Sequence, residues 1–489
     1  MKVFQKKVSI RVSILAFIAF LICNNQFLNA QNSLGVVNSN YAGVYGLQIN
    51  PANICYQPIS FDLNIAGADM FLNNNHFYSN PQNLFDMTNN KIRVATRKYN
   101  ENLSNENTLV IRNGIQSNGY VFGGVNILGP SLLFAISTDK TFAITTGFRA
   151  QLSVNNISAS SALALMEGTT YRKLQNTNLE MKDTKAAFAS WYEIGGSYAQ
   201  VTHRNMNYIH KVGGTLKLLL GTTGGFMIDK NFNGTNSNGA DLNMTNSSFS
   251  YAFAGSDKSN AITDLRGLGA SMDFGYSVQK KERNNNKRNI CPNLFGYADV
   301  SCEYKWKAGF SLLDLGAINF YNNALSTDII NGNSNWKNWG SSFKQKINEM
   351  DVMFQSNIKA EEIATNNSFL LILPGAVSAQ FDYKFFDGFY VNANIIQRIT
   401  TPKLHSLTRM NTLSIAPRIE NENFEFCMPL ILNEYQNINI GFAVRYKFFT
   451  IGSDRVGEAL GVSTVYGANV YTSIRYSISE RCKKTRRLF

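Results

Sequence analysis

The sequence predicts an all-β protein, a transmembrane antiparallel β-barrel of about 14 strands, with an N-terminal plug segment and short helices in its loops. Three observations lead to this fold class. The chain begins with an export signal, it contains no later apolar run long enough for a membrane helix, and it repeats long strands with one apolar and one polar face.

Residues 1–30 have the features of a secretory signal peptide. An apolar stretch covers residues 12–22, and Leu28-Asn29-Ala30 before Gln31 forms a small-residue cleavage site. Four basic residues precede or open the apolar stretch: Lys2, Lys6, Lys7 and Arg11. Cys23 raises the alternative of a lipoprotein signal, but Ile22 stands where that signal needs a small residue. The chain is therefore expected to pass through the Sec pathway to the bacterial outer membrane.

The segment 377–395 shows the pattern that the rest of the chain repeats. Val377, Phe381 and Phe385 alternate with polar residues, Asp387-Gly388 interrupts the run, and the alternation then resumes to Ile395. Side chains of a strand point to opposite faces with period two, so this segment predicts a hairpin with one apolar and one polar face.

The alternation over residues 300–312 is the most diagnostic after this hairpin. It places Tyr304, Trp306 and Phe310 on an apolar face, and it covers roughly 13 residues where a tilted strand needs about 9–11 to cross the hydrocarbon layer. A secreted sandwich is the alternative, but its strands are usually about 5–6 residues long. Across the chain, charged residues fall on the face opposite the aromatic ones and are predicted to face the lumen: Arg149, Lys217, Glu303, Lys305, Lys307, Arg445, Lys447 and Arg475.

These patterns divide the chain into four parts: a signal peptide (1–30), an N-terminal hatch or plug segment (31–58), the barrel (59–480) and a basic C-terminal tail (481–489). Helical spacing is expected at 158–166 and 341–354, the second helix lying at or across an opening. The Asn- and Gly-rich stretch 230–246 is predicted to be a loop.

The sequence offers no recognisable catalytic or cofactor-binding motif. The four histidines (His76, His203, His210 and His405) do not have metal-ligand spacing, and the chain lacks GxSxG, HExxH and phosphate-loop motifs. The cysteines include no CxxC; Cys291 and Cys302 are either a disulfide or two free thiols. We therefore expect no enzyme activity, no metal and no cofactor.

The charge indicates a membrane environment. The full chain carries a formal net charge of +13, and removal of the signal leaves +9, with 42 basic against 33 acidic residues. Because the protein is exported, nucleic acid is not an expected partner; outer-membrane lipid and the phosphates of lipopolysaccharide are. Unspecialised surface charge is the alternative explanation.

Three stretches resemble a known family: GLQINPAN (46–53), LLDLGAINF (from Leu312) and LPGAVSAQFDYKFFDGFYVNA (from Leu373). They are similar to an uncharacterised family of Bacteroidetes outer-membrane barrels, which is distantly similar to the FadL fatty-acid transporters and to PorV of the type IX secretion system. In FadL-like barrels an Asn-Pro-Ala near the mature N-terminus belongs to a hatch inside the lumen. The resemblance implies that role for Asn50, Pro51 and Ala52.

Two functions follow from this resemblance. A barrel that binds or passes hydrophobic small molecules predicts an apolar pocket near residues 50–52 and a lateral gap in the wall. A structural or docking barrel that serves secretion or surface-assembly machinery predicts a filled lumen and an interaction surface on the long loops.

Overall fold

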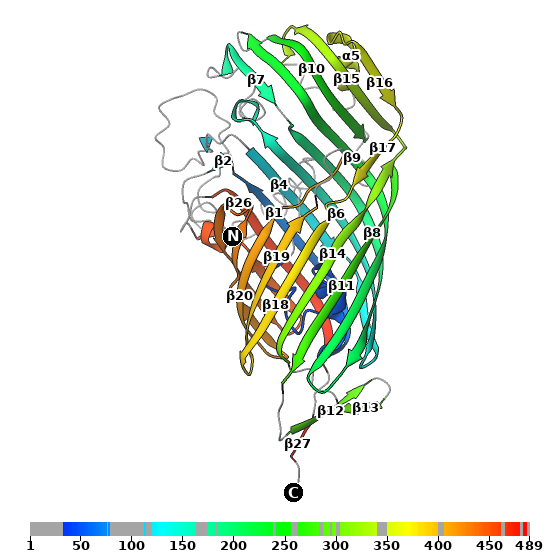
Figure 1. Cartoon of the computed structure of the whole chain (residues 1–489), viewed down its shortest axis with the longest axis vertical. Helices are drawn as coiled ribbons and strands as arrows, with labels where there is room; N and C mark the ends of the chain where they lie inside the picture. The colour runs from blue at the N-terminus through cyan, green and yellow to red at the C-terminus, as the bar shows by residue number, and fades with distance from the viewer. Residues whose placement is uncertain are drawn as a thin grey trace, which may run out of the picture.

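A computed structural model describes residues 33–75, 77–78, 112–113, 119–162, 174–181, 183–237, 241–255, 263–282, 287–293, 296–299, 304–339, 350–399, 405–460, 465–479 and 483–486. The chain forms a closed antiparallel barrel of 14 wall strands (Figure 1), as the sequence predicts. Within the described ranges, no helix has the length and apolar character needed to cross a bilayer.

The wall follows the chain order, and several wall strands consist of two consecutive segments. Their bounds are β1 Ile59–Asn74, β4 Gly119–Leu128 with β5 Ser131–Ser137, β6 Lys140–Ile157, β8 Lys185–Arg204, β9 Tyr208–Ser237, β11 Gly267–Lys281, β14 Tyr304–Phe320, β17 Phe369–Ile372 with β18 Ala376–Phe386, β19 Phe389–Arg398, β20 Thr412–Glu420, β21 Phe424–Cys427 with β22 Leu430–Asn433, β23 Asn437–Ile440 with β24 Phe442–Tyr446, β25 Phe449–Ser453 and β26 Gly467–Ser479. The barrel closes where β1 pairs with β26, from Ile59–Ser479 to Ala66–Ile474.

Proline explains three of the interruptions. Pro130, Pro374 and Pro429 lie between the two segments of their wall strands. Proline has no N–H for the ladder, so a strand breaks or bulges at that position. The predicted hairpin is confirmed: β18 and β19 pair on either side of Asp387-Gly388, with one register shift between Lys384 and Phe386, and Gly388 takes the left-handed conformation (φ +83°).

The outer face of the wall is apolar. Large side chains that point outward remain exposed, among them Leu216 (68%) and Ile194 (49%), while the inward residues beside them are buried. Phe274, Phe310 and Phe381 continue the same belt. An apolar outer band around a closed barrel is the surface that contacts lipid.

The wall continues beyond the barrel at one end as a second sheet, which we call the extension. The upper half of β9 pairs with β7 (Thr177–Met181) and β10 (Asp241–Ala254); β10 pairs with β15 (Ala324–Trp336), which pairs with β16 (Glu362–Asn366). Helix α5 (Met350–Asn357) packs there through Phe354, which contacts the rings of Tyr251 and Trp336. The extension stands at the top of Figure 1.

The extension corrects one prediction. Residues 230–246 are not a loop: most of them belong to the β9–β10 hairpin, which is paired from Gly224–Ala254 to Ser237–Asp241. Asn and Gly are poor strand formers, but backbone pairing with β7 and β15 on either side outweighs the local preference.

The two ends of the barrel differ in their connections. Five tight turns lie at one end, which we call the short-turn end: residues 138–139, 205–207, 387–388, 421–423 and 447–448. A small sheet of β12 (Lys287–Asn293), β13 (Gly296–Asp299) and β27 (Lys483–Arg486) lies beyond the same end (Figure 1), so part of the predicted basic tail pairs as a strand. Longer connections, including residues 399–411 and 454–466, lie at the opposite end.

Several predictions fall outside the described residues: the signal peptide, Glu303, Cys302 and the first part of the predicted helix at 341–354. Of the predicted helix at 158–166, the described part is helical at residues 159–162. Cys55 and Cys427, by contrast, are buried free thiols.

Candidate functional site

Residues 33–58, which we call the hatch, lie inside the lumen toward the short-turn end (Figure 1). They form two short 3-10 helices, η1 (Gly43–Gln48) and η2 (Pro51–Ile54), and contact β8, β9 and β11. Ile49, Ala52 and Ile54 are completely buried. A segment with so much buried surface is an integral part of the barrel interior.

Asn50 joins the hatch to the wall. Its Oδ1 accepts a hydrogen bond from the Ala52 N–H (2.9 Å) and so caps η2. Its Nδ2 donates to the carbonyl oxygens of Tyr276 (3.1 Å) and Phe310 (3.4 Å) and to Gln380 Oε1 (2.9 Å). Pro51 suits the first position of a helix, where no N–H is needed. Asn50 thus joins three wall strands, β11, β14 and β18, to one turn of the hatch.

Glycines in the wall make room for this turn. A Cβ added at Gly213 of β9 would lie 2.5 Å from the carbonyl carbon of Pro51, and one added at Gly275 of β11 would collide with the Asn50 side chain. The hatch backbone therefore contacts the wall directly where these side chains are absent.

A network of buried charges binds the first part of the hatch. Arg475 donates to the carbonyl oxygens of Tyr41 and Ala42, and Ser39 Oγ lies 2.9 and 2.8 Å from carboxylate oxygens of Glu420 and Glu425. Those carboxylates are in turn paired with Arg418 (3.2 Å) and Arg445 (3.0 Å). An opposite charge lies beside each of these buried groups and offsets part of the cost of removing it from water.

A second segment enters the lumen from the opposite end. Residues 405–411, which we call the strap, connect β19 to β20. The strap bonds to Ile372 of β17 through the His405 carbonyl and the Leu407 N–H (2.9 Å each) and to the β6 wall through Thr408, whose N–H donates to Ser153 Oγ (3.1 Å). It ends at Asn411, whose N–H donates to Glu434 Oε1 (2.7 Å). The strap therefore joins separate parts of the wall across the interior.

The hatch and the strap meet at a charged cavity of about 60 Å³. Asp314 is at its centre: its carboxylate contacts Arg149 (2.9 and 3.0 Å), Lys217 (2.9 Å) and Arg409 of the strap (2.6 Å). Lys217 also pairs with Asp273 (2.8 Å), and Arg149 lies 3.5 Å from Glu193. We call these six residues the lumen charge cluster. Hatch residues Val44, Leu47 and Gln48 also line the cavity, together with further wall residues.

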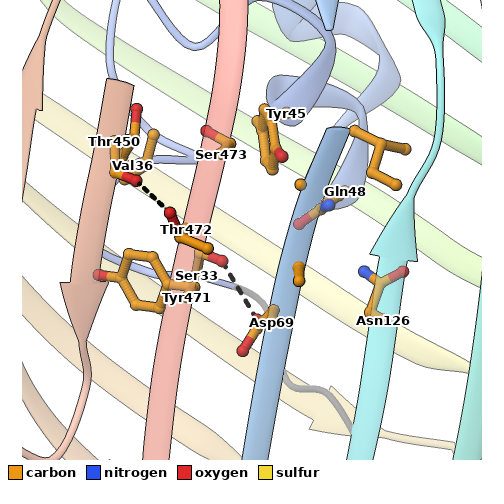
Figure 2. A pocket seen from close by; sticks show the side chains of 13 residues that line it. Ser33, Val36, Tyr45, Gln48, Asp69, Asn126, Thr450, Tyr471, Thr472 and Ser473 are labelled. Carbon is orange, nitrogen blue, oxygen red and sulfur yellow. Dashed lines mark hydrogen bonds between the residues drawn. The ribbon is translucent and has the colours of Figure 1, made fainter. Parts of the chain in front are cut away.

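A smaller cavity of about 10 Å³ lies between the hatch and the seam where the barrel closes (Figure 2). Ser33 Oγ donates to Asp69 Oδ2 (3.1 Å) beside it, and Tyr45 and Gln48 approach from η1. The described pairing of β1 with β26 ends at Ala66–Ile474, next to this cavity. Beyond that pair along β1, a side-chain hydrogen bond links the two strands: Asn469 Nδ2 donates to the Met70 carbonyl (3.3 Å). Neither of these two cavities is an apolar pocket at residues 50–52.

The structure places the predicted lumen-facing charges in different ways. Arg149, Arg445 and Arg475 are buried inside, and Lys217 is partly buried and pairs with Asp273 and Asp314. Lys307 Nζ lies 5.2 Å from the centre of the inward-facing Tyr304 ring. Arg149 and Lys217 belong to the lumen charge cluster. Arg445 and Arg475 pack around the hatch. Glu303 lies outside the described residues.

Lys305 and Lys447 do not face the lumen as predicted. Tyr304, which was predicted to lie on the outward apolar face, points inward instead. The register slips between Lys281–Tyr304 and Lys280–Trp306, which leaves Lys305 in a bulge with its Nζ 4.8 Å from the ring centre of Tyr383, on the outward face. The bulge turns Tyr304 inward, where its hydroxyl bonds to Asp382. Lys447 is exposed in the turn after β24, with φ +49°.

Sequence reasoning missed Asp314 and Arg409. By strict alternation, Asp314 would share the outward face of Phe310 and Leu312. A second bulge places Leu313 and Asp314 opposite Asp273, gives Asp314 a φ of +51° and turns its carboxylate inward. A lone Asp on an apolar face, in LLDLG, is the signal that was available. Arg409 lies between strands, where periodicity gives no orientation.

The family model of DUF5723, described as a family of unknown function, matches residues 51–454. The chain belongs to this family. No curated protein matches the chain.

Among solved structures, the chain is similar to the Pseudomonas putida toluene transporter TodX, with 8% identity, a TM-score of 0.43 and coverage of 90% of this chain and 95% of TodX. It is also similar to a Pseudomonas aeruginosa FadL homologue, with 10% identity, a TM-score of 0.41 and coverage of 92% of this chain and 99% of the homologue. The outer-membrane protease OmpT of Escherichia coli is less similar, with 7% identity, a TM-score of 0.21 and coverage of 86% of this chain and 97% of OmpT.

The closed wall with its apolar outer belt is the architecture of a bacterial outer-membrane protein, and the outer membrane is where this protein resides. Barrels of this kind have short periplasmic turns and longer extracellular loops. The short-turn end therefore faces the periplasm, and the extension and the strap belong to the extracellular side.

Proposed function

We propose that this protein passes small hydrophobic molecules across the outer membrane, through a lumen that the hatch and the strap close at rest. The observation that carries the proposal is an apolar wall inside the lumen. Trp191, Phe226, Phe320 and Phe369 form one buried cluster with Leu407 of the strap. The lumen of a water-filled porin is polar, whereas this interior offers an aromatic surface to a ligand.

The way in which the two segments are held supports the same function. The strap contributes Leu407 to the cluster and His405 stacks on Phe226 with ring centres 3.7 Å apart, so the strap covers the apolar wall. The hatch packs apolar side chains such as Ile49 and Ile54 against the wall, and hydrogen bonds and ion pairs join it to the wall as well. The polar contacts exchange for water when the segment moves, so their net contribution to holding the hatch in place is modest.

Uptake of 4-phenylbutanol by whole cells tests the proposal. Cells that carry the barrel should accumulate this apolar probe faster than cells without it, and Asn50→Ala, which loosens the hatch, should increase the rate further. Asn53→Ala is the matched control, because Asn53 lies in the same turn and is only partly buried. Equal uptake by cells with and without the barrel would refute passage.

A docking barrel is the second candidate, and one observation favours it. The extension has an apolar core of its own, with Phe249, Trp336 and Phe354, so it is a built structure on the extracellular side that transport does not require. A partner from secretion or surface-assembly machinery would bind there. Deleting residues 31–53 separates the two functions: changed uptake with intact partner binding supports passage, and the reverse supports docking.

A further inference from the structure

The charges around the cavity between hatch and strap do not balance within the wall. The wall contributes three carboxylates to the lumen charge cluster, Glu193, Asp273 and Asp314, and two cations, Arg149 and Lys217. The third cation, Arg409, belongs to the strap and contacts Asp314 at 2.6 Å. Without Arg409, the three wall carboxylates exceed the two wall cations by one. Because an unpaired buried charge is costly, the wall needs one more positive charge at this position.

The apolar cluster adjoins the same position. The Arg149 guanidinium lies 5.2 Å from the centre of the Trp191 ring, so the charged and apolar surfaces share a border. On the apolar side the strap inserts Leu407, which is 1% exposed, and on the charged side it inserts Arg409 two residues later. The strap thus presents an apolar group and a cation in the arrangement that the wall accepts.

We propose that the space filled by the strap is a binding site for a small cationic amphiphile, a molecule with an aromatic or branched apolar body and one amine or guanidinium group. The strap is the internal mimic of this ligand: Leu407 occupies the position of the body and Arg409 that of the cation. The inference rests on the proposed function, since the ligand reaches the site through the lumen, and it names the class of molecule that the lumen selects.

Three probes with one body and different head groups test this selectivity: 4-phenylbutylamine, 4-phenylbutanol and 4-phenylbutyrate. Binding to the full chain in lipid nanodiscs is measured by calorimetry against empty nanodiscs. Arg409→Gln vacates the cation position, so this variant should bind the amine at least tenfold more tightly than the wild type does, and at least tenfold more tightly than it binds the butyrate.

Three controls separate this effect from a loosened strap. Arg409→Lys keeps the cation and should behave as the wild type does. Lys337→Gln removes an ion pair with Asp241 (2.7 Å) far from the lumen, in the extension, and should also leave binding unchanged. Adding Asp273→Asn to Arg409→Gln removes one carboxylate and should abolish the preference for the amine over the alcohol.

The outcomes distinguish this inference from the proposed function. If Arg409→Gln binds the three probes equally, or prefers the butyrate, the cationic ligand class is wrong while a hydrophobic binding site remains. If none of the probes binds to any variant that still runs as a folded barrel on an unboiled gel, both the ligand class and the hydrophobic binding site are refuted.

Discussion

Replacement of Asn50 by alanine tests how firmly the hatch is held. The change removes the cap of η2 and the three bonds donated by Nδ2 to Tyr276, Phe310 and Gln380. Loss of an Asn cap costs about 1 kcal/mol. Leaving the buried Gln380 Oε1 without this partner costs about 1–3 kcal/mol more.

The sum is about 3 kcal/mol, and since about 1.4 kcal/mol corresponds to a factor of ten, the released hatch should become about 100-fold more populated. Hydrogen exchange of the amides in residues 43–55, measured by mass spectrometry in nanodiscs, reports that population directly. The wall amides of β8 and β9 serve as an internal reference and should be unchanged. Exchange in the hatch that stays within threefold of the wild type would refute the anchoring role of Asn50.

Three further predictions concern the wall and the extension. Gly213→Ala should accelerate hatch exchange, because its Cβ would collide with Pro51, whereas Gly196→Ala, with nothing within 4 Å, should not; equal effects contradict the close contact. Arg418→Met leaves Asp382 buried without its partner at 2.7 Å, and a cost of about 3–5 kcal/mol should lower the temperature at which the folded band disappears from unboiled gels; an unchanged temperature argues against the pair. Burial raises the pKa of Asp229, in the extension, to about 7. The folded state holds the Asp229 proton to higher pH than the unfolded state does, so the contribution of this group to the free energy of unfolding is complete below its ordinary pKa and is lost as the pH rises through 7. Asp229→Asn should therefore slow proteolysis of the extension at pH 8 and leave it unchanged at pH 4.

Alternation predicted the barrel because lipid contact imposes the same rule on every wall strand. An outward side chain must be apolar, and the next one faces the interior, so Phe381 and Phe385 could be assigned without knowledge of any partner strand. The rule fails wherever a bulge shifts the register by one residue. Tyr304 and Asp314 both lie at such a shift. Both side chains turn inward, where Tyr304 bonds to Asp382 and Asp314 pairs with Arg149.

The remaining differences come from tertiary context. The Asn-rich part of the β9–β10 hairpin is a strand because of the partners it meets, which lie far away in sequence. The inward path of the strap has no periodic signal at all, so the role of Arg409 is visible only once Asp314 is in place. The resemblance pointed to Asn50, while the wall glycines that receive it could be found only from the structure.

Ion conductance across a planar bilayer tests the central claim, that two movable segments close the lumen of an outer-membrane barrel. We expect the wild type to show no steady conductance, and a variant that combines Asn50→Ala with Arg409→Gln to open frequently, because both segments are then loosened at the contacts that hold them in the lumen. A wild type that conducts as a permanently open pore, or a double variant as silent as the wild type, would contradict the account.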